Sequence, residues 1–137
     1  MPEIKIYNDS GKKNLPGKKL IEILSKVFKA HGANDANVSI IFLDDAKMLE
    51  MNKKYLNHDW NTDVLTFPME EDIMDGEIYI SVDTALRQAK EYQVPFRNEI
   101  LRLAIHGALH LLDYDDITDE KRAKMTELEN KYLQLNS

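Results

Sequence analysis

The stretch that decides the fold runs from Ile100 to Asp116 and reads Ile-Leu-Arg-Leu-Ala-Ile-His-Gly-Ala-Leu-His-Leu-Leu-Asp-Tyr-Asp-Asp. Its first part is apolar on nearly every side, which predicts a helix buried at the centre of the protein. His106 and His110 are four residues apart, so a helix stacks both imidazoles on one face, one turn apart. Two imidazoles plus one nearby carboxylate can hold a divalent metal, zinc above all, with a fourth position open to water.

A histidine pair at this spacing also arises by chance, so purely structural histidines are the alternative. A buried imidazole needs a partner for each ring nitrogen. Two of the four histidines of the chain lie here, directly before the carboxylates Asp113, Asp115 and Asp116. A third ligand from this acidic turn satisfies the pair, which favours metal binding over the structural alternative.

The chain has 137 residues and a hydrophobic content of 43%, which suits one globular domain covering residues 1–137. It has no cysteine, so a disulfide framework and a thiolate metal site are both excluded. The net charge of −6 argues against a protein that holds duplex nucleic acid by bulk electrostatics. No apolar run reaches the roughly 20 residues that span a bilayer, and no signal-peptide core is visible, so we expect a soluble cytoplasmic protein.

Hydrophobic periodicity predicts an α+β fold: a small mixed sheet of about four strands packed with about five helices. The predicted strands cover residues 4–8, 38–43, 63–67 and 77–82, and Pro68 ends the third of them. Four further helices are expected around the central one. The first runs from Pro16 to near His31, and the second follows a cap at Asp44 and carries Tyr55. The third runs from a cap at Asp83 to Tyr92, and the last follows a cap at Thr118.

The motif in residues 106–116 resembles the H-G-x-L-H-L-x-G-Y-D-H signature of the YbeY family, bacterial zinc-dependent endoribonucleases of ribosomal RNA maturation. Two earlier segments support the resemblance. Residues 49–55, Asp59 and residues 62–68 look like the family's N-x-x-Y…D-x-x-T-D-V-L-S-F-P segment, and residues 76–81 are similar to its G-D-I-x-I-S strand. These segments follow one another in the family's order, which is far more specific than a lone histidine pair.

The resemblance implies a single-strand-specific endoribonuclease that matures the 3′ end of small-subunit ribosomal RNA and serves ribosome quality control. It implies one Zn²⁺ per chain, held by His106, His110 and Asp116. A metal-bound water, rather than a side chain, would attack the RNA. The implied partners are single-stranded RNA, the ribosomal RNA precursor and the small ribosomal subunit, and no membrane is involved.

The chain departs from the signature at two positions within the motif. Asp113 replaces a glycine at which the turn calls for a left-handed backbone, and Asp is among the few other residues that tolerate it. Asp116 replaces the third histidine. A carboxylate is an ordinary zinc ligand, although it also suits harder ions. Asp115 is the alternative ligand, but the family's register favours Asp116.

A third departure bears on catalysis, because Leu56 stands where the family has an arginine thought to serve RNA cleavage. His58 and Arg102 are candidates to replace that cation, with core or surface roles as the alternative for each. Tyr55 could stack on a base, but core packing is the favoured interpretation for this residue. The rival functions are a non-catalytic, metal-stabilised ribosome maturation factor and a zinc peptidase. A peptidase of the H-E-x-x-H type needs a glutamate where this chain has Gly107.

Overall fold

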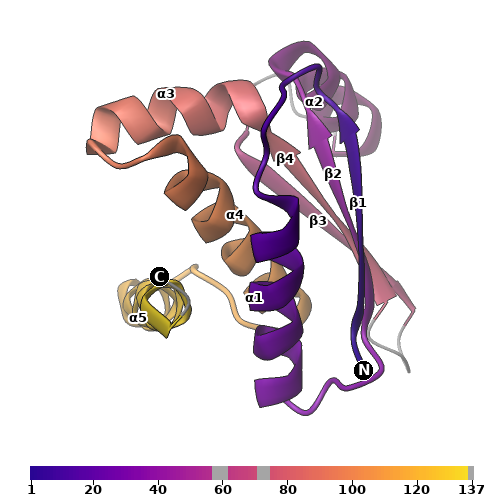
Figure 1. The fold of residues 1–137 in the computed structure, drawn as a ribbon, viewed down its shortest axis with the longest axis vertical. Coiled ribbons are helices and arrows are strands. Elements are labelled where there is room, and N and C mark those ends of the chain that lie inside the picture. Colours follow the sequence, from indigo (N-terminus) through magenta and orange to yellow (C-terminus); the bar gives the residue numbers. More distant parts are fainter. Residues whose placement is uncertain (57–61, 71–74, 136–137) are drawn as a thin grey trace.

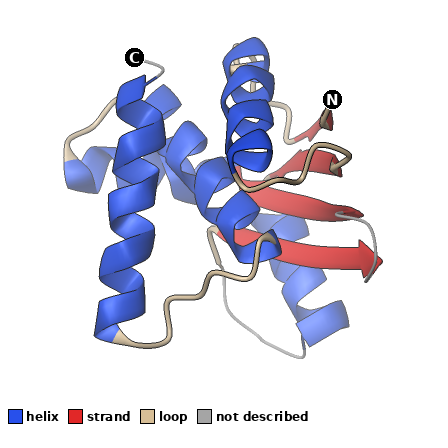
Figure 2. Ribbon diagram, turned by 90° about the horizontal axis from the view of Figure 1, so that it is seen from below, coloured by secondary structure: helices blue, strands red, loops and turns tan. Residues whose placement is uncertain are grey.

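A computed structural model describes residues 1–56, 62–70 and 75–135 of the chain. Within these ranges one four-stranded sheet is flanked by five α-helices (Figures 1 and 2), as the sequence predicts. In chain order the elements are β1 (Glu3–Asp9), α1 (Gly17–Ala30), β2 (Asn37–Leu43), α2 (Asp45–Met51), the π-helical turn η1 (Asn52–Leu56), β3 (Val64–Glu70), β4 (Asp75–Ser81), α3 (Val82–Tyr92), α4 (Phe96–Leu111) and α5 (Asp119–Leu135).

The sheet is mixed, with the strand order β1-β2-β4-β3. Strands β1, β2 and β4 are parallel, and β3 forms an antiparallel edge beside β4. In this register Ile40 of β2 lies between Ile6 of β1 and Ile78 of β4. Alternate residues of the central strand therefore build the core, and the side chains of Val38 and Ile40 are fully buried.

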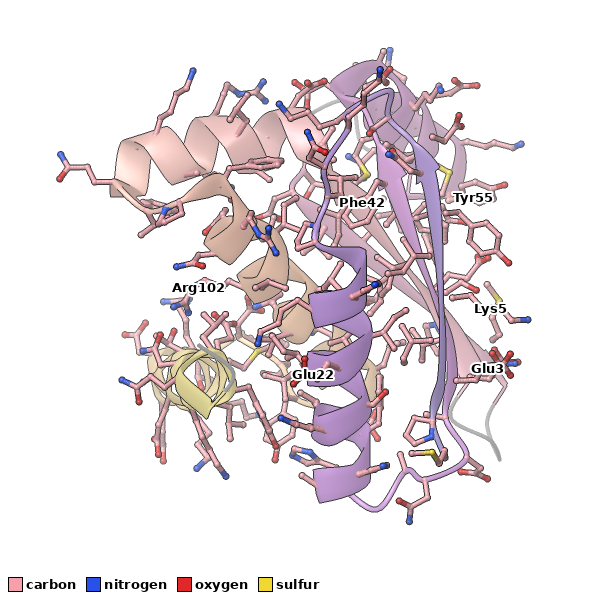
Figure 3. All side chains as sticks on the ribbon, viewed as in Figure 1. Glu3, Lys5, Glu22, Phe42, Tyr55 and Arg102 are labelled. Carbon is pink, nitrogen blue, oxygen red and sulfur yellow. The ribbon has the colours of Figure 1, made fainter. Side chains whose placement is uncertain are left out.

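Helices α1 and α4 cover one face of the sheet, and α5 packs on the outer side of α4 (Figure 1). The main core lies between these layers, and Phe42 contributes to it from β2. A smaller apolar cluster of Leu43, Met48 and Leu65 lies on the other face, beneath α2. Glu3, Lys5 and Tyr55 also lie on that side, away from α1 (Figure 3).

Strand β3 continues through Pro68 to Glu70, so the prediction that Pro68 ends the strand was wrong. Proline has no N–H to donate, but an edge strand has to pair on one side only. Pro68 pairs with Gly76 of β4, and the register shifts directly after it. The strand can therefore continue through Pro68 because β3 is an edge strand. That position depends on the whole sheet and cannot be inferred from the local sequence pattern.

The caps at Asp44 and Thr118 are confirmed, since their side chains accept hydrogen bonds from the backbone of Lys47 at 2.8 Å and Lys121 at 3.1 Å. The cap predicted at Asp83 was wrong. Helix α3 begins at Val82, two residues earlier than a cap at Asp83 implies, and its cap is Ser81, whose hydroxyl accepts from the Thr84 N–H at 3.2 Å.

The helix predicted to carry Tyr55 changes after Met51 into the π-helical turn η1, which ends at Leu56. None of the helices in the described part of the chain has both the length and the apolar character that crossing a membrane requires.

Candidate metal centre

Both histidines lie in the second half of α4, a largely buried helix that packs against the sheet and α1. Ten of its sixteen residues are buried, among them Gly107 between the two histidines. Gly107 faces the sheet, where a β-carbon would come within 2.7 Å of Ile78. Because position 107 points inward, the imidazoles of His106 and His110 lie together on the partly exposed side of the helix.

The two rings and one carboxylate converge on a common point. The Nε2 atoms of His106 and His110 are 3.0 Å apart, and Oδ2 of Asp116 is 3.7 Å from Nε2 of His106. One ligand atom from each of the three residues lies within 4.8 Å of the others. Two nitrogens and one carboxylate oxygen at such separations form a group that can bind a metal ion.

The turn after α4 brings the carboxylate back to the imidazoles. Asp113 has φ +72°, so the predicted left-handed backbone at this position is confirmed. The N–H of Tyr114 donates to the carbonyl of Leu109 at 3.0 Å, which reverses the chain directly after the helix. The Tyr114 hydroxyl also lies 3.2 Å from the ring of His31, tying the turn to the end of α1.

The neighbouring carboxylate, Asp115, is directed elsewhere. Its Oδ1 accepts from the Ile117 N–H at 3.2 Å, and its Oδ2 pairs with the Lys121 ammonium at 3.3 Å. Asp116 is therefore the member of this pair that lies beside the histidines. Its side chain is 43% exposed, so the open side of the group faces solvent.

The side of His106 away from the group contacts α5. Nδ1 of His106 lies 2.8 Å from Oε2 of Glu129, whose side chain is only 8% exposed. The other oxygen of Glu129 accepts from Arg102 at 2.9 Å, and Arg102 donates also to the Asn130 side-chain oxygen at 2.6 Å. Glu129 is not among the site residues predicted from the sequence. Its signal is its place beside the buried stripe of α5, four residues after Met125.

The local charges act in opposite directions on the two histidines. Burial lowers the pKa of His106, but the hydrogen bond and charge of Glu129, with Asp116 and Asp63, outweigh it and raise that pKa overall. Burial, followed by the charge of His106, lowers the pKa of His110. These opposite shifts favour protonation of His106 over protonation of His110.

Further carboxylates lie behind the group. Glu99, two turns before His106 on α4, is 3% exposed, and burial raises its pKa. Asp63 and Glu129 raise that pKa further, while Arg102 opposes them. This surplus of acidic groups favours a cation at the His106–His110 pair.

Among the residues that the structure describes, none of the other candidates from the sequence contributes an atom to the group of His106, His110 and Asp116. Both terminal nitrogens of Arg102 are bonded to α5. Leu56 is 39% exposed at the end of η1. His58 lies outside the described residues. Tyr55 was more strongly expected in the core, but it is 56% exposed, with its ring 5.9 Å from that of Phe67.

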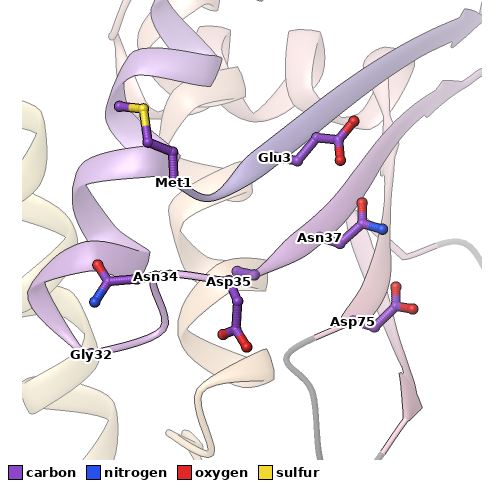
Figure 4. A pocket seen from close by; sticks show the side chains of 8 residues that line it. Met1, Glu3, Gly32, Asn34, Asp35, Asn37 and Asp75 are labelled. Carbon is purple, nitrogen blue, oxygen red and sulfur yellow. The ribbon is translucent and has the colours of Figure 1, made fainter.

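A pocket lies at the amino-terminal ends of the parallel strands, apart from the group on α4 (Figure 4). Glu3, Asn37 and Asp75 lie there side by side in the register of β1, β2 and β4. The residues that line this pocket include carboxylates and amides but no histidine, and none of them belongs to the group on α4.

Comparison with known proteins points to one family. A family model described as Endoribonuclease YbeY matches residues 5–136 of the chain. Proteins named Endoribonuclease YbeY from Chlorobium phaeovibrioides and Chlorobaculum tepidum are 35% and 36% identical, covering 96% and 95% of this chain and 89% and 95% of their own lengths. A relative of the same name from Salinibacter ruber is 31% identical, over 95% of this chain and 89% of its own.

A solved solution structure of a Thermotoga maritima protein superimposes with a TM-score of 0.70 at 32% identity, covering 96% of this chain and 87% of that one. Together these matches confirm the fold and the resemblance predicted from residues 49–116.

Proposed function

Because this chain belongs to the YbeY family of endoribonucleases, we propose that it is a metal-dependent endoribonuclease that cuts single-stranded RNA. Its role would be in maturing the 3′ end of small-subunit ribosomal RNA and in ribosome quality control. The observation that carries this proposal is the convergence of His106, His110 and Asp116 within 4.8 Å, on the segment that matches the family's signature.

The chemistry of these donors fits a single zinc ion. Two neutral imidazoles and one carboxylate are a known ligand set for catalytic zinc, which leaves a further position for water or substrate. Bound there, the metal would polarise a phosphate oxygen and lower the pKa of a water molecule toward neutrality. The carboxylate at position 116 adds a negative charge that a third histidine would not, so Mn²⁺ is a reasonable competitor for the site.

The residues of the chain supply position and charge. His106 and His110 would bind through Nε2, because these are the atoms that converge. Asp116 would close the group from the turn after α4. Since Asp116 is 43% exposed and Asp115 is drawn away by Lys121, the open side of the site is accessible to a flexible strand.

Single-stranded RNA suits the surface of this protein better than a duplex does. A chain with a net charge of −6 gains little from bulk attraction to phosphate, so exposed bases have to contribute. Tyr55 is an exposed ring with the Lys54 ammonium 5.3 Å from its centre, a combination that can stack on a base and neutralise a phosphate. The proposed partners are the ribosomal RNA precursor and the small ribosomal subunit, in the cytoplasm.

The test is RNA cleavage by metal-free and zinc-loaded protein. We expect slow cutting of single-stranded RNA that requires zinc, spares a duplex of the same sequence, and is lost in His110→Ala. Elemental analysis of the same samples should give close to one zinc per wild-type chain and none in His110→Ala. Equal cleavage by wild type and His110→Ala would indicate a contaminating nuclease and contradict the proposal.

One alternative has a specific observation in its favour. Leu56 offers no cation where the resemblance leads one to expect an arginine, which favours a non-catalytic, metal-stabilised ribosome maturation factor. Such a protein would bind zinc and RNA without cutting. RNA affinity measured across a salt series, on the samples used for cleavage, separates the two functions.

A further inference from the structure

Glu129 belongs to α5, yet it contacts the proposed metal ligand His106 on α4. Its Oε2 lies 2.8 Å from Nδ1 of His106, the ring nitrogen that faces away from His110 and Asp116. The carboxylate is 8% exposed, so little water competes for this contact. A buried carboxylate beside the outer nitrogen of an imidazole accepts a hydrogen bond from Nδ1–H, which keeps the proton on Nδ1 and leaves the Nε2 lone pair free.

Glu129 is placed to act through His106 rather than on a metal directly. Each of its oxygens already has a partner, since Oε1 accepts from Arg102 at 2.9 Å while Oε2 contacts the imidazole. Arg102 is held in turn by the Asn130 side chain at 2.6 Å. Arg102, Glu129 and His106 thus form one hydrogen-bonded chain across the interface between α4 and α5.

We propose that Glu129, fixed by Arg102, is a positioning residue that holds His106 as the Nδ1–H tautomer and aims its Nε2 at the metal. This rests on the metal site of the proposed function. A carboxylate behind a ligating histidine fixes the orientation of the ring and raises its basicity, and losing such a partner typically costs about 10–100-fold in metal affinity. The docking of α5 and the affinity for metal are then linked.

The chain offers a matched control on the same helix. Glu127 lies two residues before Glu129, but its side chain is 73% exposed and its nearest cation, Lys124, is 3.9 Å away. Glu129→Gln and Glu127→Gln remove the same charge from α5, and only the first touches a ligand. Glu129→Gln also keeps the shape of the side chain, and thermal unfolding of both variants checks that α5 remains docked.

The first measurement is zinc affinity, by competition with a chromophoric chelator. We expect Glu129→Gln to bind zinc about 10–100-fold more weakly than wild type, and Glu127→Gln to stay within about twofold. Arg102→Met should weaken zinc binding in the same direction. Because Arg102 acts through Glu129, the variant that carries both Arg102→Met and Glu129→Gln should lose less zinc affinity than the product of the fold-losses of the two single variants.

The second measurement needs neither metal nor RNA. Long-range ¹H–¹⁵N spectra of the metal-free wild type, at a pH where His106 is neutral, should show the proton of His106 on Nδ1. In Glu129→Gln part of the population should move to Nε2. A wild-type His106 protonated on Nε2, or equal zinc affinities in Glu129→Gln and Glu127→Gln, would overturn the proposal. A protein that meets both expectations but cuts no RNA would contradict only the endoribonuclease assignment.

Discussion

Gly107 lies so close to Ile78 that a β-carbon on the glycine would be 2.7 Å from Cγ2 of the isoleucine. Thr66 on the neighbouring strand would meet the same β-carbon at 3.3 Å. Helix α4 therefore rests directly on β3 and β4 at the residue between the two histidines. The same contact argues against the peptidase alternative, since a glutamate at position 107 would have to enter the core rather than the metal site.

We predict that Gly107→Ala destabilises the protein. Alanine gains up to about 1 kcal/mol in helix propensity, but its methyl group has to displace the γ-methyl group of Ile78, and overpacking typically costs about 1–3 kcal/mol. The free energy of unfolding in urea should fall by about 1–2 kcal/mol. Gly17→Ala at the start of α1 is the control, because its β-carbon would meet only Ile6 at 3.6 Å. Equal stabilities of the two variants would contradict the prediction.

The second prediction concerns the two adjacent carboxylates. Asp116→Ala removes a proposed ligand and should weaken zinc binding at least tenfold. Asp115→Ala removes the contacts with Ile117 and Lys121 and a charge near His110, but no ligand of the proposed site, so its effect on zinc binding should be smaller. Asp116→His should keep or tighten zinc binding, because imidazole is an equally suitable zinc ligand. Calorimetric titration of the three variants measures this. If Asp115→Ala weakens zinc binding and Asp116→Ala does not, Asp115 is the ligand.

Features that depend on residues close in the sequence could be predicted. The apolar run before His106 predicts the buried helix, and the four-residue spacing predicts that both imidazoles share a face. The left-handed turn at Asp113 follows from the residue types that tolerate positive φ. These conclusions need only the geometry of one helix and one turn.

Features that depend on the partner of an element could not be predicted. Pro68 is tolerated in β3 because that strand is an edge, and the edge is defined only once β4 inserts beside β2. Glu129 reads locally as one more acid on an amphipathic helix. Glu129 is 23 residues away from His106 in the sequence, and the two side chains meet because α5 packs on α4. Sequence patterns therefore give the proposed ligands, while tertiary packing supplies the group that orients them.

The third prediction is a pH dependence of the metal-free protein. The pKa of His106 is raised, so its stabilising contact with Glu129 is complete below the unfolded value of about 6.5 and is lost as pH rises through the folded value. The pKa of His110 is lowered, so its contribution is lost as pH falls below the same unfolded value of about 6.5. Together the pair should make the metal-free protein most stable near a pH of about 6.5.

Urea unfolding at a series of pH values measures how stability depends on pH. NMR titrations of the histidines show which of them causes each change in stability. Zinc affinity should rise as the pH increases through the pKa of His106, because the metal has to displace the proton from Nε2. In Glu129→Gln the pKa of His106 should fall, and the loss of stability above a pH of about 6.5 should disappear. A His106 that titrates below its ordinary range in wild type would contradict the assigned effect of Glu129.

The last prediction concerns the missing arginine. Leu56 is 39% exposed at the end of η1, so a longer charged side chain can be accommodated there without burying its charge. A cation near the scissile phosphate stabilises the charge that develops in the transition state, and one such donor can change the rate by about 100-fold or more. We expect Leu56→Arg to raise zinc-dependent cleavage of single-stranded RNA at least tenfold. Leu56→Gln, similar in reach but uncharged, should leave the rate near that of wild type. If both variants cut at the wild-type rate while zinc content is unchanged, another group already supplies the cation. The leucine at position 56 then does not limit the rate of cleavage.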